Sequence, residues 1–312
     1  MDLGIVGSSE KRTTGWKDVF VTKFGWLSPV AGHGGSNFQP IVMYQEEHIL
    51  PDVLPHFDSV WIADHFYGFD KEKKEGFLEG WVTLTWLAAR FPNVMLCHHV
   101  LGHGYRNPAL IAKMAATLQV LSGGRFILGI GGGWREDEYH SYGYDFPTAG
   151  VRLRQLEEVV QICRLMWTEA HPTFAGTYFQ IDDAAATPRP NTVPPICIGS
   201  SGEKIGLPIV GRQADIWNGG YRDDDDWKRK RDIVHAAALD AGRDPADIAC
   251  SVTVAGDLPE TDAASAQWVE RLTHLQELGV TYFVMDFGHP LDAEPGLRFI
   301  EQVIGPVKSL GT

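Results

Sequence analysis

Cysteine is scarce in this chain, and long apolar runs are absent. The 312 residues include only four cysteines, Cys97, Cys163, Cys197 and Cys250. Their spacing fits neither a disulfide framework nor a metal cluster, so we expect reduced, buried thiols that act as small hydrophobic side chains. No apolar run reaches the roughly 18 residues of a membrane-spanning helix, and the polar N-terminus has no signal-peptide apolar core. These absences favour a soluble, cytoplasmic protein.

Positive charge is also in deficit. Lysine and arginine number 27 against 40 aspartates and glutamates, which gives a formal net charge of -13. Such a chain repels nucleic acids and anionic membranes at long range, although a local basic site for phosphates is compatible with it. A Gly-x-Gly-x-x-Gly pattern with a later acidic partner is missing too, so we predict no tightly held NAD.

The stretch from Asn107 to Gly133 contains the clearest structural pattern. Asn107 can cap a helix that starts at Pro108, and apolar residues recur at three- and four-residue spacing until Gly123 and Gly124 end it. Phe126 to Ile130 is then apolar without alternation, as in a strand buried on both faces. Gly131, Gly132 and Gly133 follow and leave backbone room for a ligand. The stretch therefore predicts the helix, buried strand and ligand loop of an α/β enzyme.

Strand-like and helix-like segments alternate along most of the chain. Predicted strands are Phe24–Ser28, Ser59–Ala63, Val94–Val100, Phe126–Ile130, Ile196–Ile198, Asp215–Asn218, Ala249–Val254 and Thr281–Asp286. Predicted helices are Met43–Leu54, Trp81–Arg90, the one that starts at Pro108, Val151–Trp167, Glu203–Arg212, Trp227–Ala241, Ala263–Leu278 and Pro295–Ser309. Thr173–Ile181 reads as a hairpin inserted before the fifth strand.

Eight strands and eight helices in alternation close most naturally into a (β/α)8 barrel, because crossovers between parallel strands are right-handed. A doubly wound open sheet is the alternative. We expect a polar N-terminal segment over residues 1–22 and one barrel domain over 23–312, since no composition break marks a linker. Active sites of such barrels lie at the carboxyl ends of the strands.

Asp64 and His65 stand at the end of the second strand. An imidazole can move a proton near neutral pH, and an adjacent carboxylate can orient it, so this pair is a candidate acid or base. An ordinary polar strand end is the simpler interpretation.

His98, His99 and His103 invite a zinc site. Neighbouring residues of a strand point to opposite faces, however, so His98 and His99 cannot easily share one ion. We predict no metal.

Gly199, Ser200, Ser201 and Gly202 end the fifth strand and precede a predicted helix. Small residues and free N–H groups at a helix start can cradle a phosphate, although a plain turn would have the same composition. Asp223–Asp226 followed by Lys228–Arg231 indicates instead the solvated outer face of a helix.

Three segments together resemble the luciferase-like monooxygenase superfamily, in the branch of deazaflavin-dependent oxidoreductases. They are DSVWIADHF, RNPALIAKMAATLQVLSGGRFILGIGGGWREDEY and PPICIGSSGEKIGLPIVGRQADIWN, and the resemblance extends from about residue 23 over nearly the whole chain. It implies that Asp64 and His65 lie at the cofactor ring and the substrate. It also implies a non-prolyl cis peptide near His99-Val100, against the ring.

The same resemblance implies that the glycine loop lines the cofactor. The residues concerned are Gly131, Gly133, Trp134, Glu138 and Tyr139. The expected cofactor is coenzyme F420, and the expected reaction is hydride transfer to or from a small organic substrate. An FMN-dependent monooxygenase and a non-catalytic flavin-binding protein are the alternatives. The resemblance further implies a homodimer.

Overall fold

The computed structural model describes residues 21–33, 39–69 and 75–310. The predicted N-terminal segment, residues 1–22, therefore lies almost wholly outside the described residues. Within the described part, no helix is both long and apolar enough to cross a bilayer.

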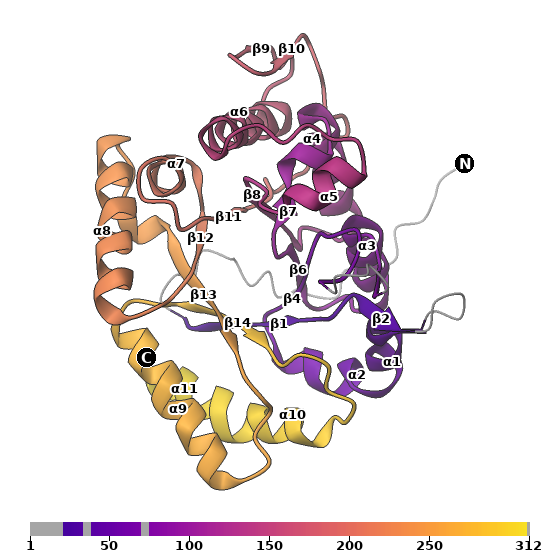
Figure 1. Ribbon diagram of the computed structural model, residues 1–312, viewed down its shortest axis with the longest axis vertical. Coiled ribbons are helices and arrows are strands. Elements are labelled where there is room, and N and C mark those ends of the chain that lie inside the picture. Colours follow the sequence, from indigo (N-terminus) through magenta and orange to yellow (C-terminus); the bar gives the residue numbers. More distant parts are fainter. Residues whose placement is uncertain (1–20, 34–38, 70–74, 311–312) are drawn as a thin grey trace.

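Parallel strands form a closed barrel at the centre of the molecule (Figure 1). Its eight strands are β1 (Lys23–Leu27), β4 (Ser59–Ile62), β6 (Met95–His98), β8 (Phe126–Gly131), β11 (Ile196–Gly199), β12 (Ile216–Gly219), β13 (Ala249–Ala255) and β14 (Tyr282–Asp286). Pairing of β8 with β11 and of β1 with β14 completes the ring, and the short β7 (Leu101–Gly102) extends the pairing along β8. The predicted barrel is confirmed, and an open sheet is excluded.

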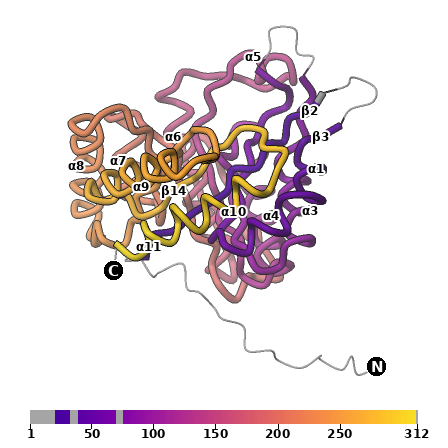
Figure 2. The backbone as a smooth tube through the Cα atoms, turned by 90° about the horizontal axis from the view of Figure 1, so that it is seen from below, coloured from indigo at the N-terminus to yellow at the C-terminus, as the bar shows by residue number. Residues whose placement is uncertain are grey.

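Helices surround the barrel (Figure 1). They are α1 (Ile41–His48), α2 (Leu50–Val53), α3 (Gly80–Arg90), α4 (Pro108–Leu121), α5 (Glu136–Ser141), α6 (Ala149–Thr168), α7 (Gly206–Gln213), α8 (Asp224–Asp240), α9 (Asp262–Glu277), α10 (Glu294–Phe299) and α11 (Gly305–Leu310). A π-helical turn, Ile300–Ile304, joins α10 to α11. Short 3-10 turns are Leu54–His56, His103–Tyr105 and Pro245–Asp247. Figure 2 shows α11 returning beside α9, so the C-terminal helices close the outer layer.

Local sequence signals account for most element boundaries. The Asn107 side chain accepts hydrogen bonds from the first turn of α4, as predicted. The predicted helix Met43–Leu54 is interrupted at Ile49, directly before Leu50-Pro51 opens α2, because proline suits a first helical turn but disrupts a helix interior. Helix α7 begins at Gly206 and not at Glu203, so a turn separates it from the Gly199–Gly202 loop.

Two small sheets lie outside the barrel. The predicted hairpin is confirmed as β9 (Phe174–Ala175) paired antiparallel with β10 (Gln180–Ile181), at the periphery of Figure 1. The loops after β1 and β4 contribute β2 (Ala31–His33), β3 (Gln39–Pro40) and β5 (Gly76–Phe77), which form the second small sheet. This sheet was not predicted, because strands of two or three residues carry no readable alternation.

Side chains alternate between the barrel interior and the helical layer. The interior cluster consists of Trp61, Cys97, Ile127, Cys197, Ile216, Tyr282 and Val284. Ser59 is buried among them and accepts hydrogen bonds from the Trp61 indole and the Tyr282 hydroxyl, each at 2.6 Å. All four cysteines are buried and free, as predicted.

The strand-three histidines confirm the predicted alternation. His98 points outward and packs between Trp81 and Phe126, with ring centroids 4.9 and 5.9 Å away. His99 points inward, where its Nε2 lies 2.7 Å from Thr253 Oγ1. They therefore face different environments.

Replacing His98 with leucine should weaken the acid sensitivity of folding. Burial lowers the pKa of His98 from 6.5 to about 4. Between these pH values the unfolded chain binds a proton that the folded chain does not, so stability falls as the pH drops below 6.5. The loss amounts to about 1.4 kcal/mol per pH unit, or roughly 2 kcal/mol at pH 5. Denaturant unfolding of parent and His98→Leu between pH 7 and pH 4.5 measures this slope. Equal slopes in the two proteins would contradict the prediction.

Candidate active site

Polar side chains line the carboxyl end of the barrel, below the loops. At this level the inward positions of β12, β13 and β14 carry Asn218, Ser251, Thr253 and Asp286. Asn218 Nδ2 donates to Ser251 Oγ at 3.2 Å, beside the His99–Thr253 pair. Burial lowers the pKa of His99, while the nearby Asp286 acts in the opposite sense. The barrel mouth thus has a polar floor that includes the His99 imidazole. Apart from His99, none of these residues was predicted from the sequence.

Four predicted cofactor residues meet beside this floor. A cis peptide bond joins His99 to Val100, as the resemblance implied. A Cβ atom added at Gly131 or at Gly199 would lie 2.8 or 2.9 Å from Val100 Cγ2. Since such contacts are closer than side chains tolerate, only glycine lets Val100 pack against the ends of β8 and β11 here.

His65 is bound by a carboxylate other than the predicted one. Its Nδ1–H donates to Glu138 Oε2 at 2.8 Å, and Glu138 lies in α5, which follows β8. Asp64, which we expected to orient His65, instead accepts from both terminal nitrogens of Arg106 at 2.9 Å and from the Gly102 N–H. The expected Asp64–His65 pairing is therefore replaced, because consecutive residues of an extended segment point to opposite sides.

Glu138 joins several loops through its buried carboxylate. Besides His65, it accepts from the Phe66 N–H and the Tyr105 hydroxyl, each at 2.8 Å, and from Arg135 at 3.2 Å. Burial alone would raise the pKa of Glu138, but hydrogen bonds from His65, Phe66 and Tyr105 hold it below the ordinary value. A charged Glu138 with four donors fixes the ring of His65.

Glu138 and Tyr139 do not face the mouth. Both side chains are buried, and Tyr139 packs against Tyr105 under the glycine loop. Gly133 has a φ of +69°, and a Cβ there would lie 2.1 Å from the Tyr139 hydroxyl. Glu138 and Tyr139, predicted to line a cofactor, thus support the loop from below. Trp134 is exposed at the surface of that loop.

The loop Gly199–Gly202 is held by polar contacts to β12 and the turn beyond it. The Trp217 indole donates to the Ser200 carbonyl at 2.9 Å, and the Gly220 N–H donates to Ser201 Oγ at 3.3 Å. A Cβ at Gly202 would meet no atom within 4 Å. Lys204 is exposed in the following turn. These residues leave an open, backbone-rich surface that suits an anionic group.

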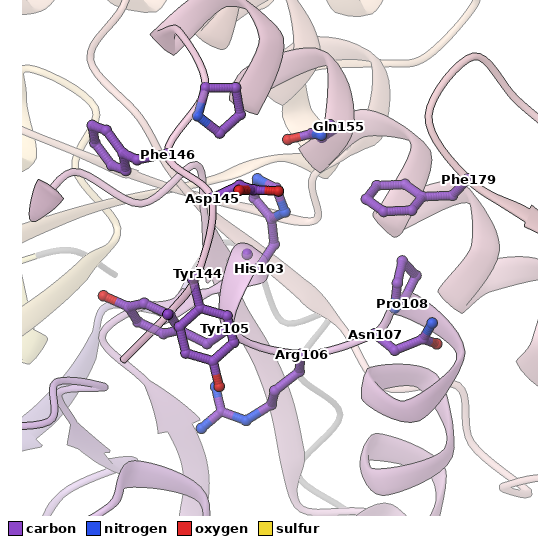
Figure 3. Close-up of a pocket in the computed structure, with 13 residues that line it drawn as sticks. His103, Tyr105, Arg106, Asn107, Pro108, Tyr144, Asp145, Phe146, Gln155 and Phe179 are labelled. Carbon is purple, nitrogen blue, oxygen red and sulfur yellow. The ribbon is translucent and has the colours of Figure 1, made fainter. Parts of the chain in front are cut away.

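A cavity of about 790 Å³ lies beside the mouth, between the start of α4, the loop before α6 and the hairpin. Phe146 and Phe179 lie on opposite sides of it (Figure 3). Its wall includes Tyr105, whose hydroxyl donates to Glu138, but none of the predicted site residues.

The described residues contain no group of three or more His, Cys, Asp or Glu side chains suited to hold a metal ion.

The chain belongs to the luciferase-like monooxygenase family, whose model matches residues 56–295. Among relatives, the "F420-dependent glucose-6-phosphate dehydrogenase" of Kineococcus radiotolerans is 38% identical over 160 residues, covering 51% of this chain and 46% of that protein. "Pyrimidine monooxygenase RutA" of Allorhizobium ampelinum is 32% identical over 167 residues, covering 52% and 45%. The chain thus spans about half the length of the curated relatives it matches.

Solved structures support the fold. The structure described as "F420-dependent secondary alcohol dehydrogenase in complex with an F420-acetone adduct" superimposes with a TM-score of 0.75 at 19% identity, covering 92% of this chain and 99% of that chain. At this identity the similarity establishes the fold alone.

Proposed function

We propose that this chain is an oxidoreductase that transfers a hydride between coenzyme F420 and a small organic substrate. The observation that carries the proposal is a histidine at the carboxyl end of the barrel, His65, whose ring is held by the buried Glu138 carboxylate, together with Val100 packed on Gly131 and Gly199. Family membership and the F420-dependent relatives support the choice of cofactor.

The residues present fit such a cofactor. Gly131 and Gly199 allow Val100 to pack at the barrel mouth, where its side chain would offer an apolar surface to a flat ring, because a Cβ at either glycine would displace Val100. Ser200 and Ser201 would offer hydroxyl groups to a phosphate, and Lys204 supplies positive charge nearby. The N–H groups of Ser200 and Gly202 already donate to the Asn218 carbonyl and to Ser200 Oγ. When bound, F420 would supply a ring that accepts or gives up a hydride.

His65 would carry the proton in this reaction. Oxidation of an alcohol, or reduction of a carbonyl, moves one proton at the oxygen atom for each hydride moved at carbon. Glu138 would act as a positioning residue, because it fixes Nδ1 and leaves Nε2 for the substrate. Asp64 would act at a distance, by holding Arg106 and the backbone of Gly102.

Two alternatives keep the same fold. An FMN-dependent monooxygenase is favoured by the relative named pyrimidine monooxygenase. A non-catalytic flavin-binding protein would need neither His65 nor its partner. Titration of the purified protein with F420 and with FMN, followed by ring fluorescence, separates the two cofactors. Binding of neither cofactor would overturn the proposal. Binding without turnover of any substrate would favour the non-catalytic flavin-binding protein.

Replacing Gly202 with leucine should weaken F420 binding by about tenfold or more. A bulky side chain would cover the loop surface proposed to contact the phosphate, while the open space around Gly202 should spare the fold. Fluorescence titration gives the affinity, and thermal unfolding reports the fold. Ser201→Ala in the same loop serves as the milder comparison. A leucine at another exposed glycine, Gly242, would not be a suitable control, because the positive φ of Gly242 would strain any side chain there. An unchanged affinity in folded Gly202→Leu would place the phosphate elsewhere.

We further propose one domain over residues 23–312, a cytoplasmic location and a homodimer. Four free, buried cysteines are consistent with a reducing compartment. A partner copy would cover the exposed apolar residues of α3 and α4, namely Val82, Leu110, Val120 and Leu121. Light scattering of the purified protein tests the dimer.

A further inference from the structure

Two large aromatic side chains are exposed next to His65. Trp134, after β8, is 66% exposed, and Phe69, after β4, is 60% exposed. Their rings are almost parallel, with an interplanar angle of 7° and centroids 6.2 Å apart. Exposed aromatic rings that cluster at one place usually mark a contact surface for a ligand or partner. We call this pair the aromatic shelf.

The aromatic shelf is fixed in place from below. The Arg135 guanidinium lies 4.8 Å from the Phe69 ring centroid and is itself held by Glu138 and the carbonyls of Tyr67 and Gly68. His65 presents its ring edge to the shelf, 5.2 Å from Phe69 and 5.7 Å from Trp134. A flat molecule lying on Trp134 would therefore lie beside the imidazole.

Charge at this place disfavours an anion. Two arginines near the His65 loop, the buried Arg135 and the partly buried Arg106, are already paired with carboxylates. Asp286 and Asp137 add negative charge around the mouth and the loop after β8. These two arginines are thus already neutralised by carboxylates, whereas a sugar phosphate needs a cation to pair with its phosphate.

We propose that the aromatic shelf binds the ring of an uncharged aromatic substrate and sets the specificity of the enzyme. The substrate class is an aryl carbinol or the matching aryl ketone, and its assignment as a substrate rests on the proposed function. In oxidation, the carbinol C–H bond would break and its electron pair would leave as hydride to F420, the O–H proton would pass to His65, and the O–H electron pair would form the C=O bond of the ketone. In reduction the same two transfers run in reverse. On this proposal the preferred substrate is uncharged, unlike the sugar phosphate in the names of several relatives.

The binding part of the proposal can be tested without turnover. Protein labelled with 5-fluorotryptophan gives ¹⁹F signals from its ten tryptophans, and the signal lost in Trp134→Phe identifies Trp134. Acetophenone should shift that signal in a saturable way. Methyl cyclohexyl ketone should bind about 3- to 10-fold more weakly, because it lacks the stacking energy of an aromatic ring. Glucose 6-phosphate should leave the signal in place.

Variants locate the effect on the shelf. Trp134→Ser should raise the KM for 1-phenylethanol or the Kd for acetophenone by about tenfold and leave F420 affinity within twofold, and Trp134→Phe should restore most of the loss. Leu239→Ser is the matched control, because Leu239 is 64% exposed on α8 away from the mouth. Absence of any F420 binding would contradict the proposed function and would leave the ¹⁹F result standing. A Trp134 signal that moves with glucose 6-phosphate but not with acetophenone would overturn the substrate class, as would a Trp134→Ser variant that loses F420 affinity instead.

Discussion

Replacing His65 with alanine should slow turnover by about 100- to 10,000-fold while F420 still binds. General acid-base help of this kind is worth roughly 3 to 5 kcal/mol, and the His65 imidazole, held by Glu138, has the geometry to give it. F420 affinity should change little, because contacts to the phosphate loop and the glycines are untouched. Stopped-flow single-turnover reduction of bound F420, across pH, measures the effect.

The matched control for His65 is Asp64→Asn. Asp64 contacts Arg106 and Gly102 rather than the imidazole, so this variant should show a smaller turnover defect than His65→Ala. If His65→Ala reduced the cofactor as fast as the parent, with the same pH dependence, His65 would have no part in proton transfer.

Replacing Glu138 with glutamine should cost both stability and turnover. The amide keeps the shape but loses the charge, and its NH2 group would face donors such as Tyr105 and Arg135. Removing one partner of a buried, hydrogen-bonded charge typically costs about 3 to 5 kcal/mol of unfolding free energy. We expect a turnover loss of about 10- to 100-fold as well, because the ring of His65 loses its anchor. Urea unfolding and single-turnover kinetics measure the two losses.

A double-mutant cycle separates the two effects of Glu138. In a His65→Ala background, Glu138→Gln should lower turnover little further, while the loss of stability persists. Glu158→Gln is the structural control, because Glu158 accepts N–H groups of Thr177, Tyr178 and Phe179 in the hairpin, away from His65. Equal, independent turnover losses in both backgrounds would remove the positioning role.

Periodicity in the sequence predicted the barrel well, because each of its strands is a short apolar run followed by a polar or glycine position. The same reasoning pointed to His65, Gly131 and Gly199, since strand ends can be read along the chain, and the family resemblance pointed to Val100. It chose the wrong partner for His65, because Glu138 is 73 residues away and contacts between loops leave no local pattern. Asn218, Thr253 and Asp286 were missed for a related reason. They lie within apolar strands, and only the closure of the barrel brings them to one floor.

The contacts of Glu138 also matter for engineering this scaffold. One carboxylate binds groups from the segments after β4, β7 and β8, namely His65, Phe66, Tyr105 and Arg135. If one of these loops were replaced alone by the loop of a relative, either the Glu138 carboxylate or some of its hydrogen-bond donors would be lost. The remaining buried groups would then be unpaired. Substrate range is therefore best altered by exchanging the three loops as a unit, or by changing side chains on their outer surface.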